Sequence, residues 1–250
     1  MRVLVSTAFA SLVFSLPLQA ETHVETINEN RLNLFFTLPE DEAQALLPAD
    51  WSLTPLPGGP AAGANALVVM IDRVSAVDAD RQPLEANENR LAVLVIFGQD
   101  AAAGEGGPVV VAGWSDAAAA APGAYGNYKD AEVTFERRMA AADKTDVEES
   151  WSVADDDGEG LHVALAYARN GATFASFDQK IYSGEDPNFH RIYRGDQGVI
   201  VAMSAPLGIG SAEEVTIRGE GAMLGALFDE DAELVAVLHL PWYRRDTFLP

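Results

Sequence analysis

The sequence contains no cysteine, few basic residues and only one long apolar run, and each shortage excludes a class of function. Without cysteine the chain can form no disulfide, no thiolate metal site and no cysteine nucleophile. Only 16 lysines and arginines stand against 38 acidic residues, which gives a formal net charge of −22. A field of this sign repels nucleic acids and anionic lipid surfaces, so we expect no nucleic-acid partner.

The one long apolar run lies at the N-terminus. A positive start at Arg2 precedes an almost wholly apolar stretch to Leu18, and Ala20 offers a small residue before the polar sequence that begins at Glu21. This pattern predicts a secretory signal peptide over residues 1–20. Because the run is short for a membrane span, we expect a protein of the periplasm or the exterior, with no membrane span after cleavage.

Residues 21–250 carry the pattern of one β-rich domain. Apolar or alternating runs bounded by glycine, proline and acidic turns predict about ten to twelve strands, and short helices are expected over 39–47 and 222–228. No linker, repeat or compositional break divides the chain. We expect a single β-rich α+β domain whose antiparallel strands form a closed or nearly closed barrel, because closure removes exposed edges.

Local turn signals suggest how the later strands connect. Asn170-Gly171 lies between two strand-like runs and is a strong short signal for a β-hairpin. Residues 195–198 are expected to join two further strands, and Pro241 is expected to end the last one.

Lysine is scarce, and one of the three lysines stands out by its surroundings. Lys129 follows the glycine- and tyrosine-containing segment 125–128 and precedes a strand-like run. A lone amine beside glycines and aromatics can serve as a nucleophile if the fold lowers its pKa by desolvation or by nearby positive charge. The alternative is that Lys129 pairs with Asp130 or another carboxylate of this acidic chain, since most lysines stay exposed.

No spacing of histidines or carboxylates predicts a metal site. The four histidines are scattered and form no His-Glu-x-x-His motif. The acidic segment 155–160 lacks the complete ligand spacing of a calcium loop, and we interpret it as a solvated hairpin turn. No metal site is therefore predicted.

The order of these segments resembles the acetoacetate decarboxylase family. The marks are Asn33-Leu34-Phe35-Phe36, a helix-like segment over 41–48 that ends in Leu-Leu-Pro, Gly126-Asn127-Tyr128-Lys129, and Leu238-His239-Leu240-Pro241. The similarity runs from about residue 30 to the C-terminus and depends on order and spacing rather than on one specific motif. It implies a cone-like barrel around an apolar cavity, and Schiff-base chemistry on a β-keto acid that needs no cofactor.

The resemblance also implies roles for single residues. Lys129 falls where the family's imine-forming lysine would lie, and Arg31 is the nearest candidate to hold the substrate carboxylate. Tyr125 and Tyr128 would shape the mouth of the cavity. Asp130, however, stands where the family's decarboxylases carry a second lysine, and its charge favours the ammonium form of a neighbouring amine.

These departures leave two functions open. The family's acidic pocket residue would fall near Ala66 or Leu67, and neither can act as an acid. One expectation is an exported protein that binds small carbonyl compounds or keto acids, with Schiff-base decarboxylation or a related lyase reaction at Lys129 as its enzymatic form. The alternative is a non-catalytic protein that binds an apolar small ligand in the same barrel. Family decarboxylases form large oligomers, so a homo-oligomer is also implied, although no run of residues marks an interface.

Overall fold

The computed structural model describes residues 21–117, 125–139 and 146–250, and the predicted signal peptide over 1–20 lies outside the described residues. In chain order the elements are β1 (Thr22–Thr37), α1 (Glu40–Ala45), β2 (Trp51–Leu53), β3 (Ala66–Asp78), β4 (Asn89–Asp100), β5 (Glu105–Ser115), β6 (Tyr128–Met139), β7 (Asp146–Asp155), β8 (Gly160–Ala168), β9 (Thr173–Ser183), β10 (His190–Ser204), β11 (Ile209–Gly210), β12 (Ala212–Glu220), α2 (Leu224–Leu227) and β13 (Glu233–Leu249). No helix in these ranges is long and apolar enough to cross a membrane.

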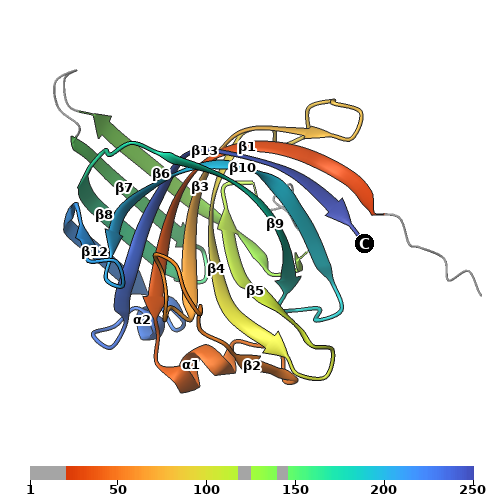
Figure 1. Ribbon diagram of the computed structural model, residues 1–250, viewed down its shortest axis with the longest axis horizontal. Coiled ribbons are helices and arrows are strands. Elements are labelled where there is room, and N and C mark those ends of the chain that lie inside the picture. Colours follow the sequence, from red (N-terminus) through yellow and green to blue (C-terminus); the bar gives the residue numbers. More distant parts are fainter. Residues whose placement is uncertain (1–20, 118–124, 140–145) are drawn as a thin grey trace, which may run out of the picture.

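Seven strands form a closed ring (Figure 1). Their order is β5, β9, β10, β13, β1, β3 and β4, and β4 pairs with β5 again. Every contact in the ring is antiparallel except the short parallel one between β5 and β9, which pairs Val109 with Tyr182 and Val110 with Ser183. The closed barrel expected from the sequence is therefore confirmed.

A second layer of strands leaves the ring at β5. Residues Gly113 to Ser115 of β5 pair in parallel with the start of β6, and β7, β8 and β12 continue outward from there. The main core lies between this layer and the outer face of the ring, where Leu32 and Leu34 of β1 join Trp151 of β7. Because side chains alternate along a strand, the intervening residues of β1 face the inside of the ring.

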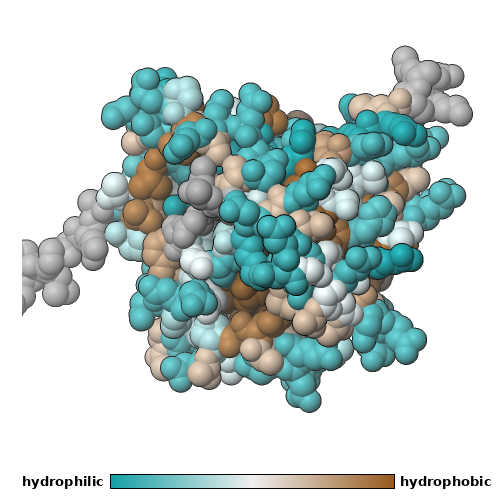
Figure 2. All heavy atoms as spheres, turned by 180° about the vertical axis from the view of Figure 1, so that it is seen from behind, coloured by the Kyte–Doolittle hydropathy of each residue, from teal (hydrophilic) through white to brown (hydrophobic). Residues whose placement is uncertain are grey.

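The short helices and the surface complete the domain. In α1, Pro39 precedes the helix and three acidic residues occupy its first turn, where they complement the helix dipole. Its Ala43 and the Leu224 and Leu227 side chains of α2 belong to the main core. Figure 2 shows hydrophilic residues over most of one face, with apolar residues in smaller patches between them.

Two strand connections differ from the sequence-based expectation. Asn170-Gly171 does not close a hairpin, because β8 pairs with β7 and β12 whereas β9 pairs with β5 and β10. The segment instead carries the chain from the outer layer back to the ring. Residues 195–198 do not separate two strands either, since they lie inside the single long strand β10. A local turn signal does not reveal which distant strands compete for pairing.

Pro241 does not end the last strand. It lies within β13, where the pairing with β1 shifts register between Arg31, opposite Leu240, and Glu29, opposite Tyr243. A bulge tolerates proline because it leaves one residue without a ladder hydrogen bond. The strand therefore continues to Leu249 and brings the residues after Pro241, which we expected to lie beyond the last strand, into the ring.

The close crossing of β10 and β13 makes a first prediction. A Cβ atom at Gly195 would overlap the carbonyl oxygen of Arg244 on the neighbouring strand, whereas one at Gly210 would meet nothing within 4 Å. We expect Gly195→Ala to lower the free energy of unfolding by about 1–3 kcal/mol or more, through overpacking against backbone. Urea denaturation should show Gly210→Ala within about 0.5 kcal/mol of the unsubstituted protein. Equal free energies of unfolding for Gly195→Ala and Gly210→Ala would contradict the close approach of β10 and β13 at Gly195.

Candidate functional site

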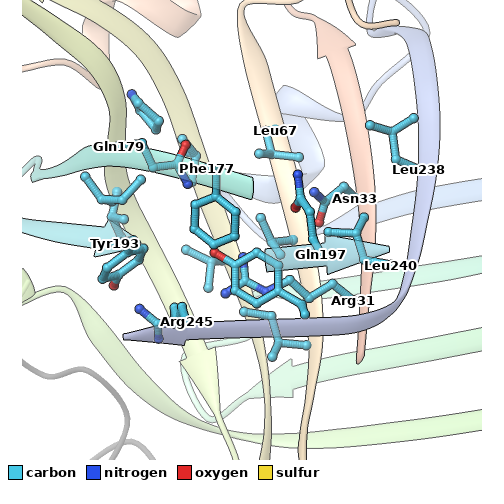
Figure 3. Close-up of a pocket in the computed structure, with 18 of the residues that line it drawn as sticks. Arg31, Asn33, Leu67, Phe177, Gln179, Tyr193, Gln197, Leu238, Leu240 and Arg245 are labelled. Carbon is cyan, nitrogen blue, oxygen red and sulfur yellow. The ribbon is translucent and has the colours of Figure 1, made fainter. Parts of the chain in front are cut away.

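The inside of the ring holds a cavity of about 310 Å³ to which all seven ring strands contribute side chains. Strand alternation explains the lining, since every second residue of β1, β3 and β4 points inward. Most of the wall is aliphatic or aromatic, and the residues of β3 and β4 that form it are Leu67, Val69, Ile71, Leu91, Val93, Val95 and Phe97. Figure 3 shows polar side chains of β1, β10 and β13, among them Arg31, Gln197 and Arg245, at the same cavity.

One buried carboxylate organises the charged part of this site. Glu29 of β1 has a fully buried side chain, and its Oε2 accepts a hydrogen bond of 2.6 Å from Nε of Arg31 and forms an ion pair with Nη2 of the same arginine at 2.5 Å. Its Oε1 lies 3.8 Å from Nε of Arg73 and 3.7 Å from Nη2 of Arg245. Three guanidinium groups from β1, β3 and β13 thus surround a single carboxylate, and Arg31 and Arg245 also line the cavity.

The charge state of Glu29 follows from two opposing effects. Burial raises the pKa of the carboxyl group because it disfavours the charged form, while the guanidinium groups of Arg31, Arg245 and Arg73 lower it. The arginines prevail, so the pKa of Glu29 lies below its ordinary value of 4.5. Glu29 is therefore ionised at neutral pH.

Tyrosine rings frame the arginines. The guanidinium carbon of Arg31 lies 3.6 Å from the centre of the Tyr243 ring, and that of Arg245 lies 3.9 Å from the centre of the Tyr193 ring. Such cation–π contacts hold a guanidinium in place where water is excluded. They fix the direction in which both cavity arginines present their remaining donors.

The two tyrosines singled out from the sequence do line the cavity. Tyr125 and Tyr128 both contribute to its wall, and the hydroxyl groups of Tyr125 and Tyr193 form a hydrogen bond of 2.8 Å. Burial raises the pKa of the Tyr125 and Tyr128 phenols. Both are therefore neutral at pH 7 and can donate hydrogen bonds without adding negative charge. Their role toward a substrate stays a prediction.

Lys129 is absent from the lining of the cavity, and this position does not support its predicted role as an imine-forming amine. Its side chain on β6 is 51% exposed, and Nζ donates a 2.9 Å hydrogen bond to Asp157 and lies 3.8 Å from Asp155. The Asp157 hydrogen bond raises the pKa of Lys129, which opposes the neutral amine that imine formation needs. The physical reason is strand alternation, because Tyr128, the first residue of β6, lines the cavity and the next side chain along the strand points to the opposite face.

The other lysines do not replace it among the described residues. Lys180 donates a 2.5 Å hydrogen bond to Glu105 and is absent from the cavity lining. Lys144 lies outside the described residues. No three histidine, cysteine or carboxylate side chains within the described ranges gather as metal ligands would.

Sequence reasoning found Arg31, Tyr125 and Tyr128 but missed the residues that organise the charge. Glu29 continues the inward-facing alternation of Arg31 along β1, and that period of two was the available signal. Arg245 follows the proline that we expected to end the last strand, so the sequence placed it beyond the sheet. Arg73 lies near the middle of β3, and no local signal distinguished it from a surface arginine.

Comparisons with known proteins give the fold a context. No protein-family model matches the chain, and no curated protein matches it by sequence. Solved structures do. An acetoacetate decarboxylase-like enzyme from Sphingomonas wittichii RW1 is 16% identical, with a TM-score of 0.55 and 96% of each chain covered.

Two further structures agree. The acetoacetate decarboxylase of Legionella pneumophila is 13% identical, with a TM-score of 0.53 over 99% of this chain and 96% of that one. The enduracididine biosynthesis enzyme MppR, complexed with pyruvate, is 14% identical, with a TM-score of 0.53 over 94% of each chain. The chain therefore has the acetoacetate decarboxylase-like fold over nearly its whole length.

The buried carboxylate makes a second prediction. Glu29→Gln leaves three buried guanidinium groups without a counter-charge, and we expect the free energy of unfolding at pH 7 to fall by about 3–5 kcal/mol. Because the folded-state pKa of Glu29 lies below its ordinary value of 4.5, its contribution is complete above that pH and is lost as the pH falls through the folded value. Urea denaturation over a pH series should show that the difference in free energy of unfolding between Glu29→Gln and the unsubstituted protein becomes smaller only below about pH 4.5. A difference that stays constant into the acid range would contradict the assignment.

Proposed function

We propose that the protein binds a small keto acid or a related carboxylic acid inside the ring, by ion pairing and apolar contact and without an imine at Lys129. The observation that carries the proposal is the position of Arg31 and Arg245 at an otherwise largely apolar cavity in the ring. A carboxylate would lie against these guanidinium groups. The hydrocarbon part of the ligand would lie against the aliphatic wall formed by β3 and β4.

The energetics favour an anionic ligand over a purely apolar one. Three guanidinium groups share one carboxylate, so a second carboxylate relieves repulsion among buried positive charges. A hydrogen bond to a charged group contributes about 1.5–3 kcal/mol, and burial of apolar surface adds about 25 cal/mol for each Å² removed from water. A neutral apolar ligand would gain only the second contribution and would leave the charge unbalanced.

The class of ligand is also supported by the fold. One structural relative is named as an acetoacetate decarboxylase, and another, MppR, was solved in complex with pyruvate. Both names refer to small oxo acids. The binding part of this chemistry needs only cationic and hydrogen-bonding groups, which the cavity contains, whereas imine chemistry needs a neutral amine in the cavity. None of the lysines that the structure describes is there.

Export is a separate part of the proposal. It is supported by the apolar run before residue 21 and the small residue Ala20. Expression of the full chain in a bacterium with a periplasm, followed by mass determination of the protein released from that compartment, tests it. A mass that begins at Glu21 supports export, and intact protein retained in the cytoplasm opposes it.

Binding provides the third prediction. Arg31→Met removes a cavity cation and leaves Glu29 with two arginine neighbours, so we expect acetoacetate and pyruvate to bind about 10- to 100-fold more weakly, from the loss of a charge-assisted hydrogen bond. Isothermal titration calorimetry measures the change. Arg138→Met is the matched control, since Arg138 has a 76% exposed side chain on the outer layer. An equal loss in both variants would point to a general charge effect, and no loss in Arg31→Met would refute the proposed contact.

Chemical trapping provides the fourth prediction. The raised pKa and exposure of Lys129 keep its amine protonated at neutral pH, so incubation with acetoacetate and borohydride should leave no specific adduct on it. Mass spectrometry of proteolytic fragments maps any labelled lysine, with Lys129→Ala as the control. An adduct on Lys129 that this variant loses, or a specific adduct on Lys144, would show that imine chemistry takes place.

A further inference from the structure

The number of charges around Glu29 exceeds what one bound carboxylate would balance. Arg31, Arg73 and Arg245 bring three positive charges to one negative charge, and the exposed fraction of the side chain is 11% for Arg31 and 2% for each of the other two. Burial lowers the pKa of Arg73, but arginine starts so far above neutrality that all three groups stay protonated near pH 7, and deprotonation does not remove the excess there. Two positive charges therefore remain without a counter-charge inside the ring.

Neighbouring groups do not supply the missing negative charge. Glu25 also interacts with Arg73 and Arg245, but it is paired with Arg191 at 2.9 Å, which brings a positive charge of its own. Burial raises the pKa values of the phenols of Tyr125, Tyr128 and Tyr243, which therefore stay neutral. Among the described residues, the excess charge around Glu29 has no internal compensation from these groups.

Hydrogen bonding shows where the unsatisfied donors lie. Arg31 directs Nε and Nη2 at the same oxygen of Glu29. Arg245 makes only a 3.4 Å hydrogen bond from Nη1 to Thr247, and its buried Nε has no partner. Buried donors without partners also occur at Nε and Nη2 of Arg73 and at the hydroxyl of Tyr243. Oε1 of Glu29 is a buried acceptor that also has no hydrogen bond, and it lies 3.8 Å from Nε of Arg73 and 3.7 Å from Nη2 of Arg245. One acceptor therefore faces several unsatisfied donors, and because buried donors are normally satisfied, this surplus of donors beside the cavity favours a further acceptor.

We propose that the ligand is a dianion, a small organic acid with two carboxylate groups, and that Arg245 holds the second one. This inference rests on the proposed function, because it concerns the same cavity. Arg31 and Arg245 come from adjacent strands, β1 and β13, and both line the cavity. Two carboxylates bring the charge around Glu29 to zero, whereas one leaves a buried positive charge. The second carboxylate also accepts from the unpartnered Nε of Arg245.

Matched acids of equal chain length test the inference. Butyrate and succinate differ by one carboxylate, as do valerate and glutarate, so each pair separates charge from size. Titration calorimetry on the full mature protein should show each dicarboxylate binding at least about tenfold more tightly than its partner, which is about 1.4 kcal/mol. In Arg245→Met the advantage should fall to less than about threefold, while the monocarboxylates keep most of their affinity through Arg31.

Each outcome decides between the two proposals. Equal affinities within each pair would overturn the dianion and leave the carboxylate site standing, whereas no binding of any acid would overturn both. A dicarboxylate advantage that survives Arg245→Met would overturn the assignment of the second carboxylate to Arg245. Because a buried arginine also contributes to stability, the unfolding temperature of unliganded Arg245→Met is measured first. If that variant is unfolded, Arg245→Lys replaces it. Loss of at least half of the dicarboxylate advantage in Arg245→Lys supports the assignment of the second carboxylate to Arg245, and an unchanged advantage overturns it.

Discussion

The short parallel contact between β5 and β9 closes the ring, and the cavity depends on that closure. Only two residue pairs form the contact, and local hydrogen bonds reinforce it. The amide of Gly184 and the side-chain amide of Asn127 both donate to the carbonyl oxygen of Val110, and the hydroxyl of Ser183 donates to the carbonyl oxygen of Tyr125. The hydrogen bond from Ser183 also holds Tyr125 at the cavity wall, so the contacts that close the ring also position a residue of the site.

Within the closed ring, Glu29 determines where positive charge can be buried. Burying a guanidinium group is costly unless a counter-charge and hydrogen bonds compensate for it, and here one carboxylate serves three strands. The arrangement contrasts with the chain as a whole, whose net charge of −22 repels anions from the surface. A local positive cluster in an acidic protein can attract an anionic ligand only at short range. The proposed selectivity for an anion therefore depends on groups inside the ring.

The chain has the acetoacetate decarboxylase-like fold, but Lys129 lies outside the cavity of the ring. β6 begins beside the ring, in parallel with β5, and then leaves it to form the outer layer. Lys129 lies on this departing strand and pairs with Asp157 in the turn after β7, which the sequence analysis had correctly interpreted as a solvated turn. A sequence position near a strand start does not determine which side of that strand's sheet the side chain will face. In this fold the order of segments predicts architecture better than chemistry.

The sequence by itself determined the class of the fold and most of the strands, because burial imposes a period of two on any strand with one face in a core. It also identified Arg31, Tyr125 and Tyr128, which do line the cavity. Only the tertiary structure decided that β8 lies in the outer layer whereas β9 lies in the ring, and that β13 continues past Pro241. It also decided that the side chains of Glu29, Arg73 and Arg245 lie together. Those outcomes depend on pairings between residues far apart in the chain. Such pairings are set by competition among all strands for partners and by the cost of unbalanced buried charge, and no local pattern contains either quantity.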